Sequence, residues 1–170
     1  MTSPPTTERD FASLIRQHSR IIDKVSYFYA TDKLPFEDLR QEIYVNIWLG
    51  LDRFRGDSKM STWIYRVAVN SALMALRSSK PRIETVSLDF GSLPISTELD
   101  DTQKENLQIL HASIDRLEAI EKGIILLWLD EYSYDEIADI LGLKRNTVAT
   151  KIHRIKDKLS KTIHHGTQRT

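Results

Sequence analysis

Apolar residues recur every three or four positions through most of this chain, which is the period of an amphipathic α-helix. The first stripe runs from Phe11 to Tyr29 and stops before the turn residues 32–35. A second stripe begins near Pro35, which suits a first helical turn, and a third is expected from a cap at Ser61 through Ser79. Further stripes lie beyond residue 106. These patterns predict an all-α fold.

Residues 133–161 predict two helices joined at a glycine. Ser133 followed by Glu136 is typical of a capping box, and Gly142 supplies a left-handed residue that ends the first helix. The second helix has an apolar stripe at Val148, Ile152, Ile155 and Leu159. Its other side carries donors and small polar groups suited to a major groove: Arg145, Asn146, Thr147, Thr150, Lys151, His153 and Arg154. The pattern favours a helix-turn-helix, although a solvated helix hairpin has a similar outline.

Local charge favours contact with DNA over simple solvation. The 24 basic and 24 acidic residues cancel over the whole chain, so any affinity for nucleic acid is confined to particular surfaces. Residues 144–161 hold seven basic residues against one acid, whereas residues 115–142 hold eight acids against two basic residues. Solubility needs no such separation, but a helix that neutralises phosphates does.

A second basic segment, residues 52–82, holds seven basic residues against two acids. Aromatic side chains stand among these charges and are suited to stacking on unpaired bases. The position of Trp63 beside Ile64 and Val67 is also typical of a core residue, and periodicity alone favours that reading.

Residues 81–105 lose helical periodicity and are rich in Pro, Gly, Ser and acids, which is the composition of a flexible linker. We therefore expect two small helical domains, at residues 1–80 and 106–170, the second with the helix-turn-helix. Two domains joined by a linker in one polypeptide suit recognition of two separated sites on one long polymer.

Other classes of protein find little support. The chain has no cysteine, no apolar signal segment and no run of about 18 apolar residues, which predicts a cytoplasmic protein without membrane insertion. A nuclease or recombinase needs a metal-binding acidic cluster or an activated nucleophile, and the acids here are scattered. His164 and His165 lie in a polar tail expected to be disordered rather than metal-binding. We expect no catalytic residue, metal or cofactor.

Two groups of motifs resemble a known family. Asp38-Leu39-Arg40-Gln41-Glu42, Trp48, Phe54-Arg55-Gly56, Thr62-Trp63-Ile64, Arg66, Asn70 and Arg77 resemble region 2 of bacterial sigma-70-type RNA polymerase sigma factors. The stretch from Tyr134 to Gly142, with Thr147-Val148 and Arg154, is similar to region 4. With only a linker in place of region 3, the chain resembles the small extracytoplasmic function (ECF) group.

The resemblance implies three sets of contacts. Asp38, Gln41 and Glu42 would bind the clamp helices of the largest subunit of core RNA polymerase. The minus-10 element, as unpaired strand, would meet Phe54, Arg55, Lys59, Ser61, Trp63, Arg66, Asn70 and Arg77. The minus-35 element, as duplex, would meet Arg145, Thr147, Thr150, Lys151, His153 and Arg154. The resemblance also implies an anti-sigma factor as a partner.

The implied function is to direct core RNA polymerase to specific promoters and to assist their melting. A helix-turn-helix regulator that binds duplex DNA outside polymerase is the main alternative, and a helical adaptor protein is a third. The chain departs from the family at Ala149, where a basic residue is frequent, and at Lys151 and Lys156, where arginine is frequent. Lys144 replaces a frequent hydroxyl cap, which leaves the start of the last helix open.

Overall fold

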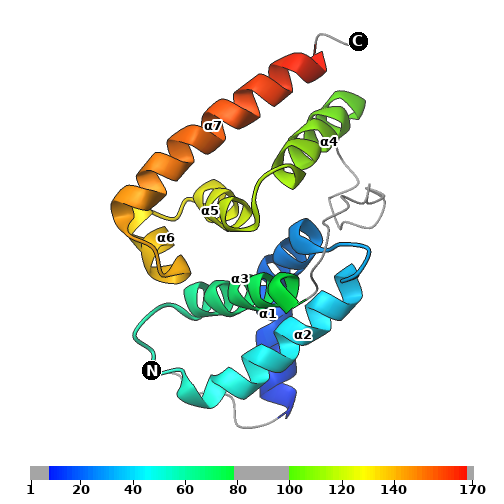
Figure 1. Ribbon diagram of the computed structural model, residues 1–170. Helices are drawn as coiled ribbons and strands as arrows, with labels where there is room; N and C mark the ends of the chain where they lie inside the picture. Colours follow the sequence, from blue (N-terminus) through cyan, green and yellow to red (C-terminus); the bar gives the residue numbers. More distant parts are fainter. Residues whose placement is uncertain (1–7, 79–99, 168–170) are drawn as a thin grey trace.

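The computed structural model describes residues 8–78 and 100–167, with side chains described up to residue 162. Within these ranges the chain forms helices joined by short turns and loops, and no strand occurs in them (Figure 1). The elements are α1 (Glu8–Tyr29), α2 (Phe36–Gly50), the short 3-10 helix η1 (Leu51–Arg53), α3 (Met60–Ser78), α4 (Asp101–Asp115), α5 (Ala119–Leu129), α6 (Tyr134–Leu141) and α7 (Arg145–Thr167). The all-α prediction is confirmed.

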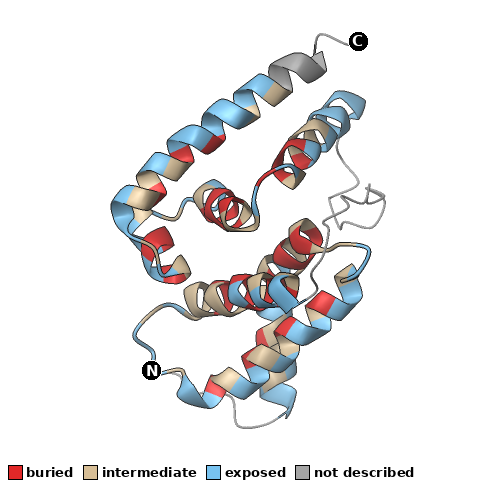
Figure 2. Cartoon of the chain, in the orientation of Figure 1, coloured by how far each residue is buried: buried red, intermediate tan, exposed pale blue. Residues whose placement is uncertain are grey.

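Helices α1, α2 and α3 pack against one another around a shared apolar core (Figures 1 and 2). The predicted stripes supply it, with Ile22 and Val25 from α1, Ile43 and Ile47 from α2, and Ile64 from α3 all fully buried. Each such side chain contributes roughly 1.5–3 kcal/mol through removal of apolar surface from water.

The start of α3 differs from the expectation. The backbone N–H of Trp63 donates to the carbonyl of Lys59 over 3.1 Å, so the helix begins at Met60. Ser61 therefore lies inside the first turn and is not the cap. The expected end at Ser79 falls outside the described residues.

Helix α4 begins inside the range expected as linker, so residues 101–105 are helical. Its first turn is closed by a capping box in which the Gln103 N–H donates to the Asp100 carboxylate over 2.7 Å. The Asp100 N–H in turn donates to the Gln103 side chain over 3.2 Å. The rest of the predicted linker, residues 81–99, lies outside the described residues.

Helices α4, α5 and α6 pack along the long helix α7. Ile114 of α4, Ile124 of α5 and Ile137 of α6 are fully buried. The carboxylate of Glu121, only 4% exposed, accepts two hydrogen bonds of 2.9 Å from Lys158 and ties α5 to α7. A buried carboxylate is costly unless it is paired, so this ion pair fixes how α5 lies on α7.

Candidate nucleic-acid interface

The predicted helix-turn-helix is formed by α6, the turn at Gly142 and α7. The Glu136 N–H donates to the Ser133 hydroxyl over 3.3 Å, and the Ser133 N–H donates to the Glu136 carboxylate over 2.8 Å. Gly142 has φ 66° and ψ 34°, the left-handed conformation that ends a helix. Both local predictions are confirmed, and α7 begins at Arg145 directly after Lys144.

One side of α7 is buried and the other is open. Val148, Ile152 and Ile155 are at most 1% exposed and anchor the helix to its domain. The open side has a shallow hollow lined by polar and basic side chains: Asn146, Thr147, Thr150, Lys151 and Arg154. Four of these were predicted as minus-35 contacts, and Asn146 was predicted only as one of the polar groups suited to a major groove.

Two further predicted minus-35 residues do not line this hollow. The Arg145 guanidinium lies over the Tyr134 ring and pairs with the Asp135 carboxylate at 3.3 Å. His153 is exposed and its Nε2 lies 3.8 Å from the Asp157 carboxylate. Their positions on the helix explain this, because residues 145 and 153 project to the opposite edge of the exposed face from Thr147 and Lys151.

Helix α3 gathers four of the predicted minus-10 residues on one face. Trp63, Arg66, Asn70 and Arg77 are spaced by three, four and seven residues, so they share one side of the helix. Asn70 and Arg77 are exposed, whereas Trp63 and Arg66 are half-buried. Met74 lies on the same side and is 66% exposed, a feature that the charge pattern did not indicate.

The loop before α3 carries the other predicted minus-10 residues. The Phe54 ring lies against the Trp63 ring with their centroids 5.4 Å apart. Arg55 and Lys59 are exposed, and Ser61 is half-buried. Trp63 is therefore partly buried against the core and also pairs with the Phe54 ring.

The outward face of α2 carries Asp38, Gln41 and Glu42, all exposed. The same face continues into apolar side chains, since Val45 is 54% exposed and Leu49 is 66% exposed. Helical spacing of three and four residues places them in line with the polar group. Sequence reasoning identified the polar half of this surface and missed the apolar half.

Comparison with known proteins assigns both halves of the chain to one family. Residues 14–82 match the family described as Sigma-70 region 2, and residues 107–159 match the family described as Sigma-70, region 4. The ECF RNA polymerase sigma-E factor of Escherichia coli (strain K12) is 30% identical over 162 residues, which cover 88% of this chain and 84% of that protein. The chain belongs to the ECF sigma factors. As a sigma factor it directs RNA polymerase to promoters, and a regulator outside polymerase is not favoured.

Other relatives of this ECF sigma factor give the same result. The ECF RNA polymerase sigma-E factor of Haemophilus influenzae is 25% identical over 160 residues, covering 87% of this chain and 84% of that protein. Sigma factors of this family are regulatory proteins without catalytic activity.

Two solved structures share its fold. The sigma factor RpoE of Bartonella quintana, in complex with the anti-sigma factor NepR, matches with a TM-score of 0.71 at 20% identity, over 92% of this chain and 98% of that one. CnrH, in complex with the cytosolic domain of CnrY, matches with a TM-score of 0.65 at 20% identity, over 94% and 91%.

None of the described helices is long and apolar enough to cross a membrane. Over residues 8–78 and 100–162, no three His, Asp or Glu side chains are grouped so as to hold a metal ion.

Proposed function

We propose that this ECF sigma factor uses three separate surfaces, one for polymerase and two for promoter DNA. The outward face of α2 binds core RNA polymerase. The α3 face with the 54–61 loop binds the unpaired minus-10 element, and the hollow on α7 binds the minus-35 duplex. Residues 1–80 and 106–170 would serve as the two binding domains, and residues 81–105, the last five of which begin α4, would lie between them.

The observation that carries the proposal is the α3 face. Trp63, Arg66, Asn70 and Arg77 converge on it from one helix, and Phe54 joins from the loop. Cations that grip a backbone beside aromatic rings that stack on bases are the elements of a single-strand site. A protein that reads only duplex DNA has no use for such a face.

Binding to this face would drive melting without any covalent step. A promoter opens only rarely, and a protein that binds only the open strands shifts the equilibrium toward the open form. Stacking on an aromatic ring is worth roughly 1–3 kcal/mol per base, comparable with the cost of unstacking one base-pair step. The chain would therefore act as a binding subunit and not as an enzyme, with no cofactor.

On α7, the Lys151 and Arg154 side chains supply positive charge beside the hydroxyls of Thr147 and Thr150. This set can hold phosphates and contact base edges in a major groove. Arg145, at the opposite edge of the exposed face, would contact a phosphate separately when its ion pair with Asp135 is exchanged for it.

On α2, Asp38, Gln41 and Glu42 would contact the clamp helices of the largest polymerase subunit. Val45 and Leu49 would form the apolar part of the same contact. A patch of exposed apolar side chains bordered by polar ones is typical of a protein interface.

A partner that blocks these surfaces is also expected. Both solved relatives are in complex with a second protein, one of them an anti-sigma factor by its description. We propose that this chain has an anti-sigma factor of its own and acts in the cytoplasm, where RNA polymerase works.

In vitro transcription with purified core polymerase tests the proposal on the promoter of the chain's own operon. We expect start-site selectivity only when the chain is added, and co-elution of the chain with core polymerase. A regulator outside polymerase would bind the DNA without either effect.

A second template separates melting from duplex binding. With the minus-10 segment mismatched, and therefore already open, the Asn70→Ala/Arg77→Ala variant should recover part of the activity that it loses on the paired promoter. An Arg116→Ala variant, at the exposed residue that directly follows α4, serves as the control. Equal activity of the double variant and wild type on paired DNA would contradict the role of α3.

A further inference from the structure

Helix α3 is covered on two of its sides. Ile64 is fully buried in the core that α3 shares with α1 and α2. The Tyr65 ring, also fully buried, meets the Tyr132 ring after α5 edge-on at a centroid distance of 5.7 Å. Val69 faces α5, because a Cβ added at Gly123 would lie 3.2 Å from its Cγ1. The second side of α3 is thus covered by the helices that follow residue 100.

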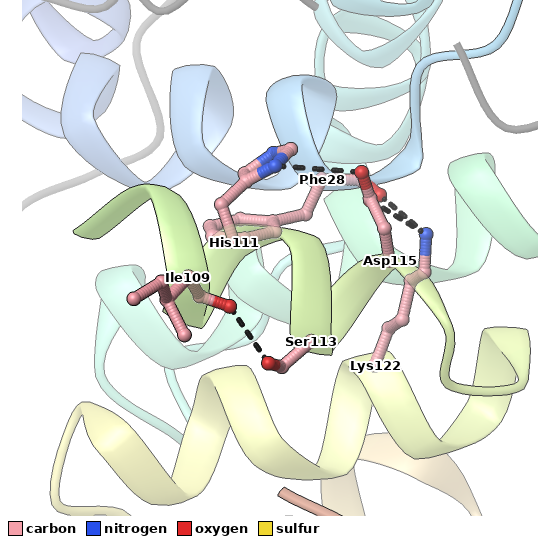
Figure 3. A network of polar contacts seen from close by, with 6 residues as sticks. All are labelled: Phe28, Ile109, His111, Ser113, Asp115 and Lys122. Atoms are coloured by element: carbon pink, nitrogen blue, oxygen red, sulfur yellow. Dashed lines mark hydrogen bonds and ion pairs between the residues drawn. The ribbon is translucent and has the colours of Figure 1, made fainter. Parts of the chain in front are cut away.

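Polar contacts join these later helices to α1 as well. The Lys122 ammonium of α5 donates to the Phe28 carbonyl over 3.0 Å and to the Asp115 carboxylate over 3.2 Å (Figure 3). The His111 ring of α4 stacks on the Phe28 ring with a centroid distance of 5.0 Å. Helix α1 has no basic residue in its last turn, so Lys122 supplies the cation that favours a helix C-terminus. None of these contacts reaches the third side of α3.

That third side is open, and it carries an apolar side chain between polar ones. Asn70, Met74 and Arg77 are exposed and follow one another at spacings of four and three residues, so they form one line along α3. Met74 is 66% exposed. Within the described ranges, the other exposed large apolar residues lie on α2 and α5: Val45, Trp48, Leu49 and Leu129. Met74 is therefore the one that lies on a predicted DNA surface.

The thioether chain of Met74 cannot serve this surface as its neighbours do. It has no charge for a phosphate and no N–H donor for a base edge. Its apolar surface gains free energy when it is removed from water, so it favours a ligand that presents an apolar group at this point. An unbranched methionine can also adjust its shape to such a group.

DNA bases present one aliphatic group of this kind, the C5-methyl group of thymine. Cytosine, the other pyrimidine, has only hydrogen at that carbon. The amide of Asn70, one turn before Met74, is of the type that pairs with an adenine edge. The two side chains together therefore suit a segment of adenine and thymine.

The position of Met74 along α3 separates this contact from the aromatic pair. Met74 comes eleven residues after Trp63, which is about 16 Å at roughly 1.5 Å per residue. Successive nucleotides of one strand are roughly 3.4 Å apart along a helix axis. A base at Met74 would therefore lie about five nucleotides from a base that stacks on Phe54 and Trp63.

We propose that the Met74 side chain contacts the C5-methyl group of a thymine in the minus-10 element and makes this chain select thymine over cytosine at that position. The proposal rests on the function proposed above for the α3 face. The contact buries about one methyl group. Its loss should weaken promoter binding about fourfold, the equivalent of about 0.8 kcal/mol.

Deoxyuridine tests the contact, because it differs from thymidine only in the methyl group. Holoenzyme assembled from core polymerase and this chain is bound to a labelled promoter of the chain's own operon. Each position of the minus-10 segment carries thymine or deoxyuridine in turn, on one strand at a time, and the two dissociation constants are compared. We expect a ratio of about four at one position, at the end of the segment away from the stacked base.

Variants of Met74 assign that ratio to its side chain. Met74→Ala should bind thymine and deoxyuridine equally at this position, whereas Met74→Leu, which keeps an apolar side chain, should retain a preference for thymine. Leu129→Ala, at an apolar residue of α5 that is 45% exposed, is the matched control and should keep the wild-type ratio. Circular dichroism checks that each variant is folded.

The same ratio for wild type and Met74→Ala at every position would overturn the proposal. Weaker binding of Met74→Ala to core polymerase in the absence of DNA would also overturn it, because the side chain would then belong to a protein contact. The transcription assay separates this failure from that of the proposed function. Wild type without start-site selectivity refutes the function, whereas selectivity without a methyl effect refutes only the Met74 contact.

Discussion

Replacing Lys151 and Arg154 by alanine removes the two cations that line the hollow on α7. Arg154 is exposed and Lys151 is half-buried at the rim, so the double variant should fold as wild type does. Its duplex affinity should fall, because both side chains are placed to neutralise phosphates.

The magnitude follows from counterion release. Each phosphate neutralised on B-DNA contributes about 0.9 to the slope of log affinity against log salt concentration. Losing two contacts should make that slope less steep by about 1.8. Between 50 and 200 mM salt, the loss of affinity of the variant should then be about 12-fold smaller than that of wild type.

Fluorescence anisotropy with a labelled duplex measures this slope. The electrostatic contribution is independent of base sequence, so the promoter need not be known. Lys156→Ala/Lys161→Ala is the matched control, with the same charge change on the same helix. Lys156 lies over the Trp128 ring at 4.2 Å and does not line the hollow. Equal slopes for the Lys151→Ala/Arg154→Ala variant and this control would refute the assignment of the hollow.

Three other predictions follow from the contacts described. Glu42→Lys should weaken core polymerase binding while changing the free energy of unfolding by no more than about 0.5 kcal/mol, and unchanged affinity in a binding titration would remove Glu42 from that interface. Ile152→Ala, at a position 1% exposed, should cost about 2–5 kcal/mol in a urea unfolding experiment, and a smaller loss would show that α7 is not anchored through this residue. Hydrogen bonds from Ser133 lower the pKa of Glu136, so this carboxylate stabilises the fold fully above about pH 4.5 and loses that effect as the pH falls through its lowered pKa. Ser133→Ala should therefore be less stable than wild type at pH 7, and the difference should shrink below pH 4.5 in thermal unfolding measurements; a constant difference would argue against the capping carboxylate.

Local signals in the sequence predicted the helix-turn-helix well. Ser133, Glu136 and Gly142 act within a few residues of one another, so their chemistry can be read without knowing the tertiary fold. The same kind of signal was present at Asp100 and Gln103, but the surrounding acids and prolines indicated a linker instead. Ser61 was the reverse case, a good capping residue that the preceding loop leaves inside the helix.

Contacts between domains could not be predicted in this way. Helix α3 also buries Tyr65 and Val69, which lie outside its predicted apolar stripe, and α3 contacts α5 and α6, which are far from it in the sequence. Arg145 was assigned to DNA from its charge, whereas its pairing with Asp135 depends on how α6 meets α7. Helical spacing predicts which residues share each of the three surfaces. Which partner each surface binds remains a prediction.

The hydrogen bond from the Lys122 ammonium to the Phe28 carbonyl joins α5 to the end of α1. Separation of the domains would leave the last turn of α1 without its counter-charge, and this turn would fray. Amide hydrogen exchange near residue 29 would then speed up although no ligand touches it. Hydrogen exchange at the end of α1 thus reports whether α5, more than ninety positions away in sequence, still contacts it.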